Sequence, residues 1–158
     1  MVASLDVSHF KEVVGHYATG LVVVSAATPD GPAGFTCQTF GSLSLEPALV
    51  TFAASSDGQS WSIVRQCDLV GISILSAQQE SLARRFAMSG VDKFDGVPWE
   101  KGPEGSPFIE GALAHIEGTI SSLSTHGDHD VAVVEVRHAV AHNGHPLIYF
   151  RGGFTELA

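Results

Sequence analysis

The sequence is poor in positive charge. Its 158 residues include 8 Lys and Arg against 17 Asp and Glu, which gives a formal net charge of −9. Nucleic acids and anionic membranes require a basic face, so we expect neither as a partner. No apolar run reaches the roughly 20 residues of a membrane helix, and the first residues lack the basic and apolar stretches of a signal peptide. We therefore expect a cytoplasmic protein.

Several catalytic motifs are also absent. The sequence contains no G-x-S-x-G elbow, no G-x-x-x-x-G-K-[ST] loop and no G-x-G-x-x-G fingerprint. Only two cysteines are present, Cys37 and Cys67, and their separation matches no metal or redox spacing, so we expect free thiols. A chain of this length predicts a single domain, residues 1–158, with no separate nucleotide-binding half.

The hydrophobic pattern predicts many short strands and few helices. A first helix is expected near the start of the chain, with Ser8 as its N-cap and Gly20 as its end. A short helix is expected near 61–65, and the capping-box pair Ser76 and Gln79 predicts another at about 78–88. Strands are expected at 21–27, 34–40, 49–54, 69–75, 112–120, 131–140 and 146–151.

The links between these segments complete the expected architecture. Residues 89–107 are rich in Gly and Pro and are expected to form a loop. Asn143-Gly144, between the last two strands, is a sequence typical of a tight hairpin. Six or seven strands joined by short turns favour a closed antiparallel barrel with two or three flanking helices, because closure removes exposed strand edges.

One segment has the composition of a ligand-binding surface. Between Gly34 and Pro47, hydroxyl and amide side chains alternate with apolar ones. Such a strand packs on one face and offers hydrogen bonds on the other, which suits a flat ligand with polar edges.

Three other groups are candidates for binding or catalysis. Arg84, Arg85 and Lys93 either mark a phosphate site or pair with nearby acidic residues. The loop 55–60 is either an anion site with hydroxyls and free amides or an ordinary capping loop. His126 and His129 are either metal ligands or polar residues of a turn, and no third ligand is evident.

The segments, in their order along the chain, resemble the flavin reductase-like family, the short NAD(P)H:flavin oxidoreductases of two-component monooxygenases. The resemblance covers nearly the whole chain and rests on Ala18-Thr19-Gly20, the segment 34–47, the Ser-rich loop 55–60, Leu82-Ala83-Arg84-Arg85-Phe86-Ala87, Val91-Asp92-Lys93-Phe94, Gly111-Ala112-Leu113-Ala114, Gly127-Asp128-His129 and the segment 146–152.

The resemblance implies a mainly β fold, a closed antiparallel split β-barrel of Greek-key type with two or three flanking helices. It also implies a homodimer, FMN or FAD as flavin, NADH or NADPH as hydride donor, and a separate flavin-dependent monooxygenase as partner. No metal is implied. The residues it assigns to the flavin are Thr36, Cys37, Gln38, Thr39, Ser55, Ser56, Gly58, Ser60, Arg85, Phe86 and Lys93. His129 is the expected catalytic residue, and it should lie on the nicotinamide side with Tyr149, Arg151 and Gly152.

Two departures from the family pattern bear on the flavin site. Many relatives carry Asn-Ser where this chain has Gln38-Thr39, and Ser-Arg where it has Gly58-Gln59. Loss of the arginine, with Asp57 beside it, weakens the phosphate end of the site and leaves FMN versus FAD undecided. It also keeps open the alternative of a flavin carrier with little reductase activity. A second alternative is an enzyme that retains its flavin and acts on a small organic substrate.

Overall fold

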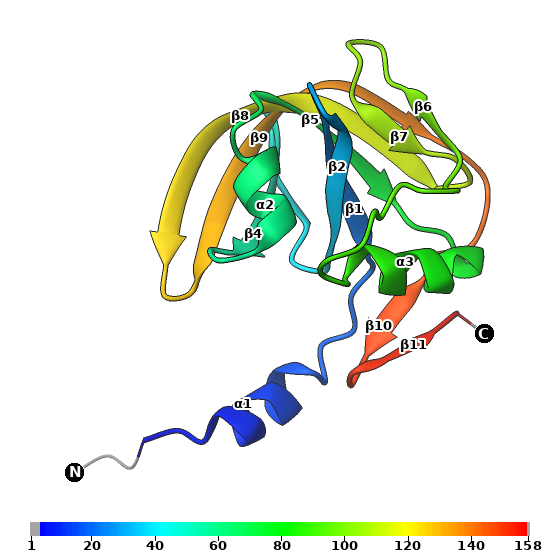
Figure 1. The fold of residues 1–158 in the computed structure, drawn as a ribbon. Coiled ribbons are helices and arrows are strands. Elements are labelled where there is room, and N and C mark those ends of the chain that lie inside the picture. Colours follow the sequence, from blue (N-terminus) through cyan, green and yellow to red (C-terminus); the bar gives the residue numbers. More distant parts are fainter. Residues whose placement is uncertain (1–3, 158) are drawn as a thin grey trace.

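The computed structural model describes residues 4–157. The expected domain, 1–158, thus extends beyond this range at residues 1–3 and 158. The expectation that the first residues are not a signal peptide falls partly on residues 1–3, outside the described range. A seven-stranded antiparallel sheet with the order β2-β1-β5-β8-β9-β4-β3 forms the body (Figure 1). Its strands are β1 (Val22–Thr28), β2 (Gly31–Cys37), β3 (Gly41–Leu45), β4 (Ala48–Ser55), β5 (Leu69–Ile74), β8 (Ala114–His126) and β9 (His129–Ala141).

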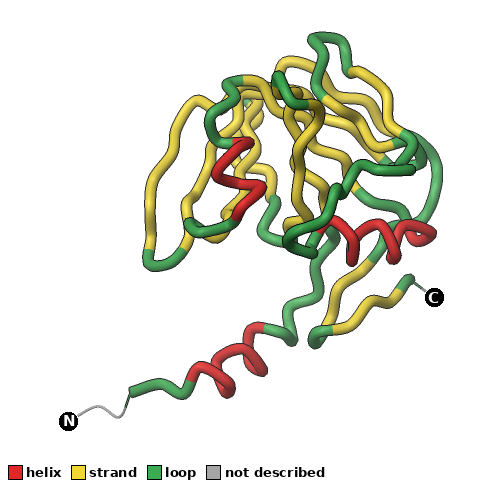
Figure 2. Tube along the Cα trace, viewed as in Figure 1, coloured by secondary structure: helices red, strands yellow, loops and turns green. Residues whose placement is uncertain are grey.

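Short elements flank this sheet. Two small hairpins pair β6 (Trp99–Lys101) with β7 (Pro107–Ile109), and β10 (Ile148–Phe150) with β11 (Gly153–Thr155). The helices are α1 (Val7–Val14), α2 (Gln59–Val64) and α3 (Glu80–Phe86), and a 3₁₀ turn, η1 (Ala77–Gln79), precedes α3. Figure 2 shows that α2 and α3 cover the curved sheet whereas α1 stands away from it. No helix of residues 4–157 is both long and apolar enough to cross a membrane.

The expected class, a mainly β fold with a large antiparallel sheet and three helices, is confirmed. In Figure 1 the long strands β8 and β9 arch over the other strands. Within the described residues, however, no ladder joins the two edge strands β2 and β3. Barrel closure is therefore not established by the pairing.

Strand β1 is apolar throughout because both of its faces are buried. Val22 and Val24 belong to a core inside the curved sheet, together with Phe52 of β4 and Trp61 of α2. The alternate Val23 faces a second core, formed with α3 and the segments around it. Since successive side chains of a strand point to opposite faces, a central strand between two cores must be apolar at every position.

Three of the expected elements differ in the structure. The expected strand 34–40 ends at Cys37, and β3, which the sequence did not reveal, follows after a bend. The expected loop 89–107 contains β6 and the start of β7. The N-cap of the first helix is Asp6 rather than Ser8, because the Asp6 carboxylate accepts a hydrogen bond from the Ser8 backbone amide. The helix ends at Val14 rather than near Gly20.

The tight hairpins also lie elsewhere than expected. Asn143-Gly144 joins β9 to β10, which are not neighbours in a sheet. The β8–β9 hairpin turns instead at Gly127, which has φ 61°. The β10–β11 hairpin turns at Arg151 and Gly152, with φ 51° and 76°. Consecutive positive φ values are those of a type I′ turn, whose first position usually holds Asn, Asp or Gly, so an arginine there is uncommon.

Candidate flavin and nicotinamide site

A cavity of about 500 Å³ lies between β2, α2 and the loop after α3. It gathers most of the residues that the sequence assigned to the flavin, although they come from distant parts of the chain. Those that line it are Thr36, Cys37, Gln38, Thr39, Ser55, Gly58, Ser60, Phe86 and Lys93, and His129 also lines it. A cavity of this volume lies within the ~300–1,000 Å³ usual for small-molecule sites.

The segment Thr36–Thr39 forms one wall, and its hydroxyls are already engaged. Thr36 donates from Oγ1 to the Ala83 carbonyl oxygen at 2.7 Å. The Thr39 hydroxyl donates to the Ala53 carbonyl oxygen at 2.6 Å and accepts from the Ala53 amide at 2.8 Å. These bonds fix the wall against α3 and β4. The hydroxyls of Thr36 and Thr39 therefore position the segment. Of its side chains, the Gln38 amide is best placed to bind a ligand.

Cys37 is a buried thiol in the same wall. Its Sγ lies 3.0 Å from the Thr39 hydroxyl. Burial raises the pKa of the thiol, although its hydrogen bonds with Thr39 and Ala53 oppose the shift. A thiol that stays protonated is a poor nucleophile, so Cys37 contributes packing rather than covalent chemistry.

Lys93 is the one Lys or Arg among the residues that line the cavity. Its Nζ donates to the Ser60 hydroxyl at 2.8 Å and to the Gly34 carbonyl oxygen at 3.3 Å. Desolvation lowers the pKa of this half-buried ammonium group. Among residues 4–157 no carboxylate forms an ion pair with it. A cation held only by neutral partners is suited to bind an anionic ligand.

Arg85 does not line this cavity. Its guanidinium donates from Nε to the Lys93 carbonyl oxygen at 2.9 Å and from Nη2 to the Asp92 carbonyl oxygen at 2.7 Å. These two bonds hold the end of the loop 87–93, which forms another wall. The sequence did not assign residues 87–91 to the site, although Ala87 and Val91 belong to two of the motifs that carry the resemblance.

The Ser-rich loop after β4 is divided between the cavity and the protein interior. Ser55 lines the cavity and donates from Oγ to Asp57 at 2.6 Å. Ser56 turns the other way and donates from Oγ to buried Asp130 at 3.0 Å. Ser56, predicted as a flavin contact, is thus not among the lining residues.

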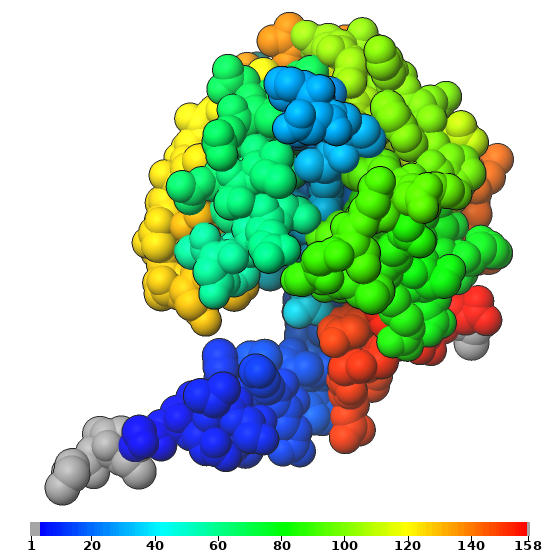
Figure 3. Space-filling view, viewed as in Figure 1, coloured from blue at the N-terminus to red at the C-terminus, as the bar shows by residue number. Residues whose placement is uncertain are grey.

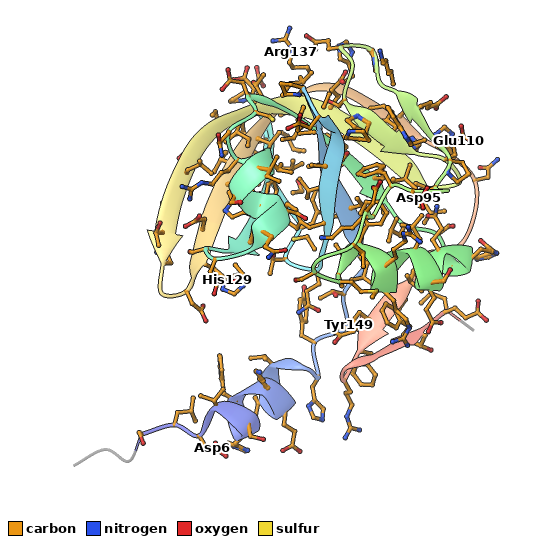
Figure 4. The ribbon with its side chains drawn as sticks, in the orientation of Figure 1. Asp6, Asp95, Glu110, His129, Arg137 and Tyr149 are labelled. Atoms are coloured by element: carbon orange, nitrogen blue, oxygen red, sulfur yellow. The ribbon has the colours of Figure 1, made fainter. Side chains whose placement is uncertain are left out.

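His129 reaches the cavity from the β8–β9 hairpin, opposite Ser55 in the β4–β9 register. Its Nδ1 lies 2.8 Å from the Asp128 carboxylate, a contact that lowers the pKa of Asp128. The carboxylate accepts a hydrogen bond from Nδ1–H, which leaves Nε2 available to a ligand. Figure 4 shows His129 at the end of the hairpin, away from Tyr149.

The other predicted nicotinamide-side residues lie apart from His129. Tyr149 and Gly152 line a second cavity of about 1,010 Å³ between β1 and the segment that follows α1. The two cavities share Gln38 and Thr39. Arg151 occupies the exposed β10–β11 turn and lines neither cavity.

The second cavity also has a residue that the sequence did not single out as a site residue, Thr19. Its backbone amide donates to the Tyr149 carbonyl oxygen at 3.0 Å, and the Tyr149 amide donates to the Thr19 carbonyl oxygen at 2.9 Å. This pairing holds the segment that precedes β1 beside β10.

A metal site at the hairpin histidines finds no third ligand within the described range. Among the described residues, the one group of three potential metal ligands lies elsewhere and consists of Glu104, Glu117 and His138. Glu117 already accepts hydrogen bonds from the Glu104 and Ser106 amides, at 2.7 and 2.8 Å. Arg137 donates to Glu104 at 2.6 Å. These carboxylates are satisfied by protein groups, so the cluster does not require an ion.

Comparison with known proteins identifies the class of molecule. Residues 14–158 match the family model of the flavin reductase like domain. The chain therefore belongs to the flavin reductase-like family, and the resemblance seen in the sequence is confirmed.

Individual relatives cover nearly all of the chain. The reductase subunit HsaB of a flavin-dependent monooxygenase from Mycobacterium tuberculosis (strain ATCC 25618 / H37Rv) is 37% identical over 99% of this chain and 86% of its own. The FMN reductase (NADH) SmoA of Agrobacterium fabrum is 37% identical over 94% of this chain and 85% of its own. The solved NADH:FAD oxidoreductase SgcE6 of Streptomyces globisporus, in complex with NAD and FAD fragments, superposes with a TM-score of 0.92. It is 34% identical and covers 99% of this chain and 98% of its own.

Proposed function

We propose that this protein is an NAD(P)H:flavin oxidoreductase that transfers a hydride from the nicotinamide to FMN or FAD and supplies the reduced flavin to a separate monooxygenase. The observation that carries the proposal is Lys93, a half-buried ammonium group that forms no ion pair with a carboxylate of residues 4–157. Among these residues no other Lys or Arg lines its cavity, and no Asp or Glu does. The phosphate of a flavin is an anion that Lys93 can bind, and the planar flavin ring suits the wall formed by Thr36–Thr39.

The residues of this chain then bind and orient two ligands. A bound flavin and nicotinamide supply the hydride acceptor and donor themselves, so no side chain need act as an obligatory base. Lys93 and Ser60 hold the phosphate end, and Gln38 and the backbone of Thr36–Thr39 hold the ring edge. His129 Nε2 orients the nicotinamide. Correct placement of two reactants contributes ~7–11 kcal/mol in well-oriented systems, which is the main role left to the protein.

We further propose that the curved sheet closes into a split β-barrel. Phe35 of β2 and Phe52 of β4 meet edge to face at 6.1 Å between ring centroids, and both contact Trp61 of α2. Strands from the two ends of the sheet thus share one core, which supports closure through side chains.

A homodimer is part of this proposal. Helix α1 has no buried residue, and its apolar side chains Phe10, Val13 and Val14, like Tyr17 just after it, are about half exposed or more. Figure 3 shows α1 projecting from the body. An amphipathic helix of eight residues is not stable alone in water. The apolar side of α1 supports packing against a second copy of the chain.

A cytoplasmic location completes the proposal. Cys37 and Cys67 are free thiols, which suits a reducing compartment. The proposed hydride donor, NADH or NADPH, is a metabolite of the same compartment.

The test is nicotinamide oxidation by the purified protein with FMN, FAD or no added flavin, first with NADH and then with NADPH. Saturable oxidation that requires free flavin is expected, and the flavin with the higher kcat/KM identifies the substrate. Flavin binding without oxidation of NADH or NADPH would instead establish the carrier alternative. Yellow protein after extensive dialysis, active on an added organic substrate, would establish the enzyme with retained flavin.

A further inference from the structure

Asp130 is a buried carboxylate directly beneath the loop that we assign to the flavin phosphate. Only 5% of its surface is exposed. Its register partner in β4 is Ala54, and the neighbouring register pair is Ser55 with His129. Since successive side chains in a strand alternate between faces, His129 reaches the cavity while Asp130 points into the protein behind it.

Four side chains donate to this carboxylate, and they come from three separate segments. The Trp61 indole donates to Oδ2 at 2.8 Å, and the Arg65 guanidinium lies 3.4 Å from the same oxygen. The Ser56 hydroxyl donates to Oδ1 at 3.0 Å, and the Thr125 hydroxyl donates to it at 2.8 Å. One carboxylate therefore connects the Ser-rich loop, helix α2 and the β8–β9 hairpin.

The loop has a second attachment to the same hairpin. The Ser56 amide donates to the Asp128 carbonyl oxygen at 3.0 Å. Ser56 is thus held through both its backbone and its side chain, whereas its neighbour Ser55 lines the cavity. This arrangement explains why the two adjacent serines have different roles.

The charge on Asp130 is needed for these contacts. An ionised carboxylate accepts hydrogen bonds from neutral donors more strongly than an amide does, and a buried one requires them. The indole of Trp61, followed by Thr125 and Ser56, lowers the pKa of Asp130 to about 2. The group is therefore ionised at every pH at which the enzyme would be assayed.

We propose that Asp130 is a positioning residue for the phosphate end of the flavin site, acting through Ser56 on the loop 55–58 and through Trp61 on α2. This inference rests on the proposed function, because it requires the flavin phosphate to lie at that loop. Asp130 does not itself touch the ligand. Its removal should let the loop and Ser60 shift relative to Lys93, which weakens phosphate binding and leaves the ring site intact.

The test compares FMN with riboflavin, which has the same ring and ribityl chain but no phosphate. Dissociation constants are measured by quenching of flavin fluorescence, so the test does not depend on reductase activity. The variants are Asp130→Asn and Ser56→Ala, with Ser62→Ala and Asp30→Asn as matched controls. Ser62 donates to the Gln59 carbonyl oxygen within α2, and Asp30 lies in the exposed β1–β2 turn. Should Asp130→Asn fail to fold, Ser56→Ala cuts the same link without disturbing Trp61.

Wild-type protein should bind FMN more tightly than riboflavin. Asp130→Asn should raise the Kd for FMN by about tenfold, the loss expected for hydrogen bonds to a charged group, with less than about a twofold change for riboflavin. Ser56→Ala should act in the same direction, the double variant should be no worse than Asp130→Asn alone, and the controls should match wild type.

Two results would overturn the inference. The first rejects only the role of Asp130, whereas the second also rejects the proposed location of the flavin phosphate. If wild type prefers FMN and the variants weaken both flavins equally or neither, Asp130 is structural only and the phosphate site stands. If wild type binds the two flavins equally, the phosphate does not lie at this loop. That failure appears in the unmodified protein and also removes the proposed location of the flavin phosphate.

Discussion

Lys93 and Ser60 meet across the cavity, with Nζ 2.8 Å from the serine Oγ. They are 33 residues apart in the chain, one in the loop after α3 and the other in the first turn of α2. The contact brings together a cation and a hydroxyl that the sequence assigned separately to a phosphate. Because no other Lys or Arg of the described residues lines the cavity, this pair supplies the positive end of the proposed flavin site.

Replacing Lys93 with methionine should weaken binding of phosphorylated flavin. We expect the KM for FMN to rise by roughly ten- to a hundredfold, since a charge-assisted hydrogen bond is worth about 1.5–3 kcal/mol. Riboflavin should be affected much less. Lys101→Met, on exposed β6, is the control. An equal rise in KM for both flavins would mean that Lys93 supports the loop rather than binding the phosphate.

Arg85 should act on the same site through the loop that it holds. Arg85→Ala removes the donors to the Lys93 and Asp92 carbonyl oxygens, so we expect faster amide hydrogen exchange in 87–93 and a loss of about 1–3 kcal/mol in the free energy of unfolding. The KM for FMN should also rise, but the increase should be several times smaller than the increase in Lys93→Met.

The adjacent arginine provides a matched control for this variant. Arg84 pairs with Glu80 at 2.9 Å and lies over the Phe154 ring, on the exposed side of the same helix. Arg84→Ala should leave the exchange of the loop unchanged. If both alanine variants behave alike, the effect belongs to the helix and the loop-holding role of Arg85 is wrong.

His129 should affect the nicotinamide rather than the flavin. In His129→Ala we expect the KM for NADH to rise by about tenfold, the loss of roughly one hydrogen bond, with little change in the KM for flavin. His126→Ala is the control, because His126 is its register partner in the same hairpin but does not line the cavity. Reduction at the wild-type rate with an unchanged KM would exclude the proposed role.

The apolar side of α1 should hold the proposed dimer together. We expect wild-type protein to sediment at twice the mass of one chain, and Phe10→Ser with Val14→Ser to sediment as a monomer. Each such side chain contributes about 1.5–3 kcal/mol when fully buried. Glu12→Ser, an exposed polar position on the same helix, should remain dimeric. A monomeric wild type would reject the dimer outright.

Local sequence features predicted the parts of the fold that depend on neighbours in the chain. The capping box of Ser76 and Gln79 is present with both of its bonds, and α2, β1 and β5 lie where the hydrophobic pattern indicated. Tight turns were harder, because Asn143-Gly144 has the composition of a hairpin but its flanking strands pair elsewhere. Pairing is decided by the whole sheet, which no local window contains.

The site, like the fold, combines features that residue type predicts with features that only distant parts of the chain determine. The chemistry of Lys93, Ser60 and the Thr36–Thr39 segment was visible from residue type, and the fold brings them into one cavity. The directions of Ser56 and Arg85 were not visible. Ser56 points to Asp130, 74 residues away in the chain, and Arg85 to carbonyl oxygens that carry no sequence information. Side-chain direction at a site is set by such tertiary partners.

The lowered pKa of Lys93 predicts that, as the pH rises, FMN binding weakens while the contribution of Lys93 to the free energy of unfolding increases. Burial disfavours the ammonium form, so Lys93 loses its proton at a lower pH than the ordinary 10.5. As the pH rises through that lowered pKa, the site loses its cation and the KM for FMN should rise.

Stability should change the other way over the same range of pH. The unfolded chain there binds more protons at Lys93 than the folded protein does, so this group's contribution to the free energy of unfolding increases with pH. Lys93→Arg keeps its charge and should flatten the alkaline limb of the FMN profile, whereas a riboflavin profile should lack that limb even in wild type. KM values for both flavins between neutral and alkaline pH provide the measurement. An alkaline limb that persists in Lys93→Arg would assign the titration to another group.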